Sequence, residues 1–186
     1  MAYKHGVYCS EVPTSIVPPV NTAAGLPVVF GTAPVHLATD PAPANRPVLC
    51  YSYAEAVAAM GYSADWDKYS LCEVIYSQFA LYNRAPIVLV NVLDPATHKT
   101  AVPQAEKDIT DDQIILDDPV LLDTLVVKKT ASSNALVAGT DYVAAYNDKE
   151  QVVISVLEGG ALDGELKAFV NYDKVNAAAV IATDII

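Results

Sequence analysis

Basic residues are scarce in this sequence. Eleven Lys and Arg stand against 22 Asp and Glu, which gives a formal net charge of −11. Affinity for nucleic acid rests largely on Lys and Arg side chains that neutralise phosphates, so the composition argues against direct nucleic-acid binding. A run of 18 or more apolar residues is also missing, and no basic stretch followed by an apolar one begins the chain. We therefore expect a protein that assembles in a cytosol without direct contact with nucleic acid or membrane.

Sequence motifs of the common enzyme classes are absent as well. The chain has no G-x-x-x-x-G-K-[ST] phosphate loop, no G-x-G-x-x-G, no G-x-S-x-G and no H-E-x-x-H. Its histidines, His5, His36 and His98, fall in a predicted arm, loop and linker, each without a carboxylate at useful spacing. These absences predict a protein that is not an enzyme and carries no cofactor.

Cysteine is rare, and its spacing indicates neither a disulfide framework nor a zinc site. Cys9, Cys50 and Cys72 are odd in number and scattered through apolar or strand-like stretches. We predict buried free thiols at these positions.

The acidic stretch DITDDQIILDD is the one cluster of candidate metal ligands. Hard cations such as Ca²⁺ bind several oxygens together, and this stretch offers the carboxylates of Asp108, Asp111, Asp112, Asp117 and Asp118. It lacks the glycine-centred spacing of a calcium loop. A solvated boundary between two domains is the better interpretation, and no metal site is predicted.

Hydrophobic residues make up 53% of the 186 residues, which is enough for a sizeable core. Apolar runs at 26–34 (LPVVFGTAP), 47–52 (PVLCYS) and 87–93 (IVLVNVL) predict three strands. The first run is continuous and closed by Gly31 and Pro34, which suits a strand buried on both faces of a sheet.

Two helices are predicted between the second and third strands. Ser52 and Glu55 have the Ser-x-x-Glu spacing of a capping box, and Gly61 follows as a stop signal. Ser70 and Glu73 repeat the capping-box spacing. A second helix is then predicted up to Pro86, with one apolar stripe formed by Leu71, Ile75, Phe79 and Tyr82. The order strand, strand, helix, helix, strand predicts an α/β layer with parallel character, but three strands make a thin sheet with two faces to cover. This half is expected to be incomplete.

Short strand-like runs follow Asp94, separated by polar or glycine-containing turns. They read QIILDD, DTLVVKK, DYVAAYN, QVVISVLE and ELKAFVNYD, and NDKE has a suitable length for a hairpin connection. The pattern predicts a small antiparallel β domain. The final NAAAVIATDII is apolar to the last residue, which predicts that the chain breaks off where a further strand or linker should lead into more protein. The 11 tyrosines fall mostly in predicted strands and helix stripes, as packing and interface residues do.

The chain begins with an extended, proline-containing segment, YKHGVYCSEVPTSIVPPV at 3–20. One strand-capable run, Gly6–Val12, precedes Pro13, Pro18 and Pro19, which cannot continue a hydrogen-bonded ladder. Twenty extended residues reach about 66 Å at about 3.3 Å per residue, more than the diameter of a small domain. We expect an arm that contacts a neighbouring molecule.

The segment from YKHGVYCSEVP to VVFGTAPV resembles the N-terminus of contractile phage tail sheath proteins, including the sheaths of phage-derived contractile injection systems. The likeness continues through PVLCYSYAEAVAAMGY, YSLCEVIYSQFALYNRAPIVLVNVLDP and GTDYVAAYNDKEQVVISVLEGGAL, in the same order and spacing. It implies a structural subunit of a virion tail, assembled in the bacterial cytoplasm. Such a subunit polymerises helically around the tail tube and contracts to drive the tube through the host envelope.

The resemblance also implies roles for individual segments. The arm, residues 1–20, would exchange a strand with a neighbouring subunit through Gly6, Val7, Tyr8, Cys9, Ser10, Glu11 and Val12, with Pro13, Pro18 and Pro19 as the hinge. Residues 21–96 would be the first part of an α/β core, 97–178 an inserted β-rich domain facing outward, and 179–186 the start of the return to the core. The implied partners are further copies of the chain, the tail tube protein, and the baseplate and tail terminator proteins. The family's C-terminal half and its arm have no counterpart in this sequence.

Two other function classes fit parts of the sequence. A small-ligand-binding α/β protein with a β-rich appendage would place its pocket near Gly31–Pro34, with Thr32, His36 and Asn91 as polar groups. An adhesin or carbohydrate-binding module would use the β-rich part alone, and the missing signal peptide counts against it.

Overall fold

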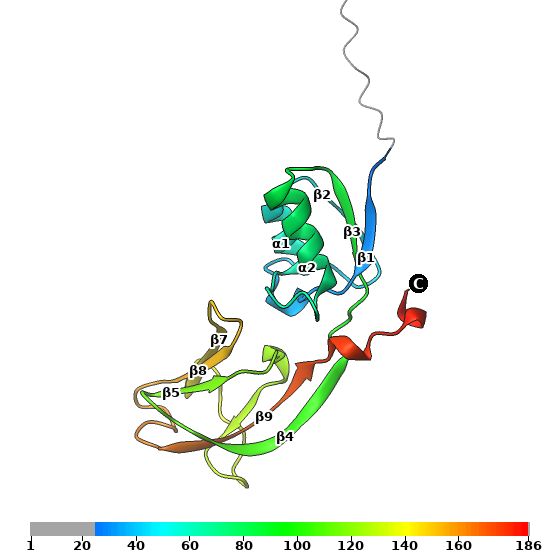
Figure 1. The fold of residues 1–186 in the computed structure, drawn as a ribbon. Coiled ribbons are helices and arrows are strands. Elements are labelled where there is room, and N and C mark those ends of the chain that lie inside the picture. The colour runs from blue at the N-terminus through cyan, green and yellow to red at the C-terminus, as the bar shows by residue number, and fades with distance from the viewer. Residues whose placement is uncertain (1–24, 186) are drawn as a thin grey trace, which may run out of the picture.

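The structure is a computed structural model that describes residues 25–185 (Figure 1). It contains one three-stranded sheet with helices, followed by two further three-stranded sheets whose strand pairs are all antiparallel. The predicted mixture of an α/β part and an antiparallel β part is therefore confirmed. Within the described residues, no helix has the length and apolar character needed to span a bilayer.

The first sheet has the strand order β1-β3-β2. Its elements are β1 (Val28–Gly31), β2 (Pro47–Cys50), α1 (Tyr53–Met60), α2 (Ser70–Ile75), a π-helical turn (Tyr76–Leu81) and β3 (Ile87–Asn91). β1 runs parallel to β3, whereas β2 runs antiparallel to it. The expected parallel character holds for one of the two strand pairs.

The start and stop signals of α1 act as predicted. The Ser52 hydroxyl oxygen accepts a hydrogen bond from the Glu55 amide at 3.2 Å. The Glu55 carboxylate in turn accepts from the amide of Tyr51 at 2.8 Å, one residue before the position that a standard capping box uses. Gly61 ends the helix with a φ of 73°, a left-handed value that side chains with a Cβ adopt at a cost.

The predicted capping box of α2 is wrong. Tyr69 occupies the N-cap position and makes no side-chain capping bond. Ser70 instead binds the end of β1: its hydroxyl oxygen accepts from the Thr32 amide at 3.2 Å, and its own amide donates to the Thr32 hydroxyl oxygen at 3.2 Å. Ser70 therefore makes a tertiary contact with Thr32 instead of the helix cap that the local pattern predicts.

The apolar stripe of the second helix is only half correct. Leu71 and Ile75 are fully buried, whereas Phe79 is half-buried and Tyr82 is 68% exposed. The segment changes from α-helical to π-helical at Tyr76, so positions after it rotate away from the face that a 3.6-residue period predicts.

Helices α1 and α2 cover one face of the first sheet (Figure 1). Their core consists of the buried residues Ala33, Val35, Cys50, Ala56, Met60, Leu71, Ile75, Ile87 and Leu89. The side chains of alternate strand positions, including Val29 and Val48, point into this core because neighbouring residues of a strand face opposite sides.

The β-rich segment forms two sheets, β4-β9-β6 and β5-β8-β7. The strands are β4 (Lys99–Asp108), β5 (Gln113–Leu116), β6 (Val126–Lys128), β7 (Tyr142–Tyr146), β8 (Val152–Val156) and β9 (Lys167–Val175). The hairpin around NDKE is confirmed, with Tyr146 opposite Val152. Buried residues from both sheets form one core, among them Leu116, Val127, Ile154 and Val170, and Leu162 joins them from the turn between β8 and β9.

The longest strand, β4, is not predicted by the sequence pattern. Nearly all of its residues are exposed, and Pro103 lies at an irregularity in its pairing with β9 between Val102 and Ala105. An edge strand of this kind carries charged side chains and a proline instead of an apolar alternation, so it resembles a linker in the sequence. The stretch after His98, which the sequence places in a linker, is therefore a strand.

Candidate functional site

The predicted strand-exchange residues, Gly6–Val12, and the hinge prolines Pro13, Pro18 and Pro19 lie outside the described residues. Cys9 and His5 lie there as well. The exchange of this strand between subunits therefore stays a prediction, and the candidate site among residues 25–185 is the surface of the first sheet that no helix covers.

This open sheet face is formed by β1, β3 and β2 on the side away from the helices. The register places Val28 and Leu49 on either side of Val88, and Phe30 beside Val90. Val28 and Phe30 are each 53% exposed and Leu49 is 44% exposed. Within residues 25–185, the expectation that the first strand is buried on both faces is wrong for Val28 and Phe30, although Val90 beside Phe30 is buried. The expectation that three strands leave this half incomplete stays a prediction.

Within residues 25–185, no strand pairs with the outer edge of β1, which adjoins the open sheet face. The carbonyl oxygens of Pro27 and Gly31 accept from Val88 and Val92 at 2.9 Å, so the backbone groups of Val28, between them, point away from β3. β1 itself has no charged residue, no proline and no bulge, the features that usually block pairing at a sheet edge. The edge and the face together can accept another strand or an apolar segment.

The polar groups proposed for a ligand pocket are used inside the fold. Asn91 is fully buried; its Oδ1 accepts from the amides of Ala33 and Leu93 at 3.0 Å each, and its Nδ2 donates to the Leu93 carbonyl at 2.7 Å. The Thr32 hydroxyl donates to the Lys68 carbonyl at 2.7 Å. Asn91 and Thr32 hold loops against strand ends, and Asn91 is not accessible to a ligand.

The third polar group, His36, does line a cavity of about 370 Å³ between the first sheet and the β-rich segment. Its ring lies 6.3 Å from that of Tyr69 and 6.0 Å from that of Tyr146, and its buried Nδ1 has no hydrogen-bond partner among residues 25–185. Burial lowers the pKa of His36 to about 4, because the charged ring would lose its hydration. The cavity is otherwise lined mainly by apolar residues such as Leu93 and Leu121.

This environment predicts a stability loss in mild acid. The pKa of His36 in the folded state lies below the unfolded value of 6.5. The contribution of the neutral ring to folding stability is therefore fully present above pH 6.5 and is lost as the pH falls toward 4. Between pH 7 and pH 5, linkage gives a loss of about 2 kcal/mol from His36 alone. We expect His36→Phe to remove that part of the pH dependence in urea unfolding. If the free energy of unfolding changes with pH in the same way in the unaltered protein and in His36→Phe, the surroundings of His36 do not hold its ring neutral.

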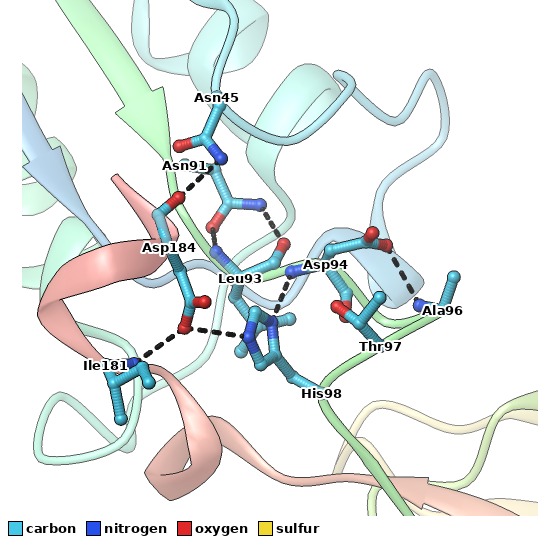
Figure 2. Close-up of polar contacts among 9 residues, drawn as sticks. All are labelled: Asn45, Asn91, Leu93, Asp94, Ala96, Thr97, His98, Ile181 and Asp184. Atoms are coloured by element: carbon cyan, nitrogen blue, oxygen red, sulfur yellow. Dashed lines mark hydrogen bonds and ion pairs between the residues drawn. The ribbon is translucent and has the colours of Figure 1, made fainter. Parts of the chain in front are cut away.

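His98 has a carboxylate partner, which its sequence spacing did not predict. Its Nδ1 accepts from the amide of Asp94 at 3.0 Å, so Nε2 carries the proton that is directed to Asp184 Oδ2 at 3.1 Å (Figure 2). The pKa of Asp184 is lowered, chiefly by the hydrogen bond from the Ile181 amide and further by His98. The Asp184 carbonyl also accepts from Asn45 Nδ2 at 2.6 Å. These contacts fix the last described turn against the turn that precedes β2 and against the residue before β4.

Sequence spacing could not reveal this cluster. Asp184 lies 86 positions after His98 and 139 after Asn45, and no local pattern links residues so far apart. The only signal was the polar residue Asp184 within an apolar C-terminal stretch.

The acidic stretch and the cysteines behave as structural residues. Asp118 accepts from Tyr172 at 2.7 Å and from Lys174 at 2.9 Å, and Asp117 accepts from Gln151. No group of three or more candidate ligands able to hold a metal ion occurs in the part of the chain that the structure describes. Cys50 and Cys72 are buried and free, as predicted.

Comparison with known proteins gives one informative match. The chain is 28% identical over 189 aligned positions to the tail sheath protein of Burkholderia phage BcepMu, and the alignment covers 99% of this chain. It covers 36% of the phage protein, so the chain spans little more than a third of that relative's length. No family model matches the chain, and no solved structure matches it.

Proposed function

We propose that this chain is the N-terminal portion of a structural subunit of a contractile tail sheath. The observation that carries the proposal is the similarity to a phage tail sheath protein along 99% of the chain. The subunit polymerises helically around a tail tube in the host cytoplasm and contracts to drive the tube through the cell envelope. It performs no catalysis, and its partners are other subunits, the tube, the baseplate and the terminator.

In this proposal the arm joins neighbouring subunits by strand addition. Gly6–Val12 forms main-chain hydrogen bonds with a sheet of another copy, and Pro13, Pro18 and Pro19 prevent the arm from folding back onto its own subunit. Contacts that repeat head to tail build an open helical tube instead of a closed ring. The proposed linkage is the same whether the chain belongs to a phage tail or to a DNA-free injection particle.

The proposed division of the chain follows from this role. Residues 21–96 form part of the core, 97–178 form an inserted outer domain, and 179–186 return to the core. Separate hydrophobic clusters in the two halves support the division, as does the contact of Asp184 with Asn45. A third, smaller cluster, which includes Leu93, Leu121 and Val175, packs the two halves together. In the complete subunit, further polypeptide covers the open sheet face, where Val28 and Phe30 are exposed in this chain.

Electron microscopy of the complete gene product tests the proposal. We expect hollow cylinders with a regular axial striation, in a long narrow form, a short wide form, or both. A product that stays monomeric at all concentrations and ionic strengths would contradict the sheath role.

The small-ligand alternative keeps one supporting observation, the cavity beside His36. It lies where β1 and β3 end, the usual position of ligands in α/β sheets. A small molecule that shifts the NMR signals of Tyr146 and His36 on binding would favour this alternative, provided that the protein forms no cylinders.

A further inference from the structure

Four aromatic side chains gather on the surface of the helix layer and are not used by the proposed function. Tyr53 and Tyr62 have ring centroids 5.8 Å apart, and Trp66 and Tyr76 have centroids 5.7 Å apart. Tyr53 begins α1 and Tyr76 begins the π-helical turn, and these two elements pack against each other, so both pairs belong to one layer. We call these four residues the aromatic cluster.

The aromatic cluster is only partly covered by its own chain. Trp66 is 38% exposed and Tyr53 is 37% exposed, while Tyr62 and Tyr76 are half-buried. Aromatic residues that keep this much area in water are typical of protein interfaces, where they supply large contact area at low entropic cost. Packing of the helix layer alone explains the buried parts of Tyr62 and Tyr76 but not the exposed ring of Trp66.

Two exposed carboxylates lie close in sequence to the aromatic cluster, together with one exposed cation, Lys68. Glu73 is exposed and precedes Tyr76 by three residues, which places both on the same side of the helix. Asp67 is exposed and follows Trp66 directly. Neither carboxylate forms an ion pair within residues 25–185, whereas the nearby Asp65 pairs with Lys68 at 2.6 Å.

Aromatic faces and carboxylates together favour a cation with a flat, delocalised charge. An arginine guanidinium can stack on a Trp or Tyr ring and bind a carboxylate at the same time, and lysine does this less well. The net charge of −11 would attract a basic partner from a distance. Acidic neighbours would repel phosphates, so a role as a base-stacking platform for nucleic acid is disfavoured.

We infer that the aromatic cluster, with Glu73 and Asp67 at its rim, is a docking surface for an arginine-bearing segment of a partner protein. The inference does not depend on a sheath role, because it rests on the side chains of one surface. The partner segment lays one or more guanidinium groups on Trp66 and Tyr76 and pairs them with the rim carboxylates.

Trp66 provides a direct test, because it is the only tryptophan of the chain. We would titrate the full chain with nona-arginine and, at the same ionic strength, with nona-lysine, and follow tryptophan emission and heat of binding. Nona-arginine should change the emission saturably and bind at least fivefold more tightly than nona-lysine. Equal affinity for the two peptides, or binding without any change in Trp66 emission, would overturn the inference.

Matched variants separate this surface from general charge attraction. Glu73→Gln and Asp67→Asn each remove one negative charge at the cluster and should weaken nona-arginine binding about threefold or more. Glu158→Gln removes the same charge at an exposed turn of the β-rich segment and should leave binding within experimental error. An equal loss in all three variants would assign the binding to net charge and refute a specific docking surface.

Discussion

Deleting residues 1–20 is expected to abolish tube formation while leaving the rest of the chain folded. Residues 25–185 contain complete hydrophobic clusters in both halves, and β1 begins only at Val28. Loss of the arm therefore removes the proposed main-chain linkage between subunits without opening a core. Far-UV circular dichroism and a thermal melt would check the fold, and electron microscopy would check assembly. Tubes of normal length from the deletion would eliminate the arm mechanism.

A variant of unchanged length makes the test more specific. Tyr8→Pro combined with Ser10→Pro removes two amide donors from the proposed exchanged strand and should prevent assembly as the deletion does. Ser15→Pro places the same residue type in the hinge, between prolines already present, and should assemble normally. Similar assembly defects in both variants would show that proline anywhere in the arm is harmful, which would argue against a specific strand.

Replacing Asn91 with leucine is expected to destabilise the fold more than most single substitutions do. The side chain is fully buried and satisfies the amides of Ala33 and Leu93 and the carbonyl of Leu93. Leucine has a similar volume but leaves these three main-chain groups unpaired, and each such group costs about 1–3 kcal/mol. We expect Asn91→Leu to lower the free energy of unfolding by about 3–5 kcal/mol, a large share of typical domain stability.

Asn171→Leu is the matched control. Asn171 lies in β9, is half-buried, and its side chain makes no hydrogen bond to any other described residue. The same substitution there should change the free energy of unfolding by less than about 1 kcal/mol in urea titrations. If the two variants lose similar stability, the three hydrogen bonds of Asn91 do not hold the strand ends together.

Much of the fold could be predicted from the sequence because its signals are local. The capping residues Ser52 and Glu55, the stop at Gly61 and the hairpin around NDKE each depend on neighbours within a few positions. Such signals survive in the structure unless a tertiary contact competes for the same atoms. Ser70 shows that competition, since its hydroxyl binds the amide of Thr32.

The features that the sequence did not predict depend on residues far apart in the chain, or on side chains that no other part of the described structure covers. His98 acquired its carboxylate from Asp184, far along the chain, and a long apolar run around Phe30 predicted burial that the three-stranded sheet does not provide. The pattern of apolar runs predicts a sheet of only three strands, but it does not predict which side chains of that sheet stay exposed. β4 escaped because an exposed edge strand carries no apolar alternation.

Strands β4 and β9 lie antiparallel, with Lys99 opposite Val175, so the two passages of the chain into and out of the β-rich lobe are neighbours (Figure 1). Changes at the far end of the lobe do not alter the spacing of these two adjacent strands. They therefore have little effect on the structure of the first sheet. We therefore expect loops at the far end of the β-rich lobe to tolerate insertions with little effect on the first sheet. The near end is tied to the first part of the chain, because Leu121 and Val175 pack with Tyr69, Cys72 and Leu93.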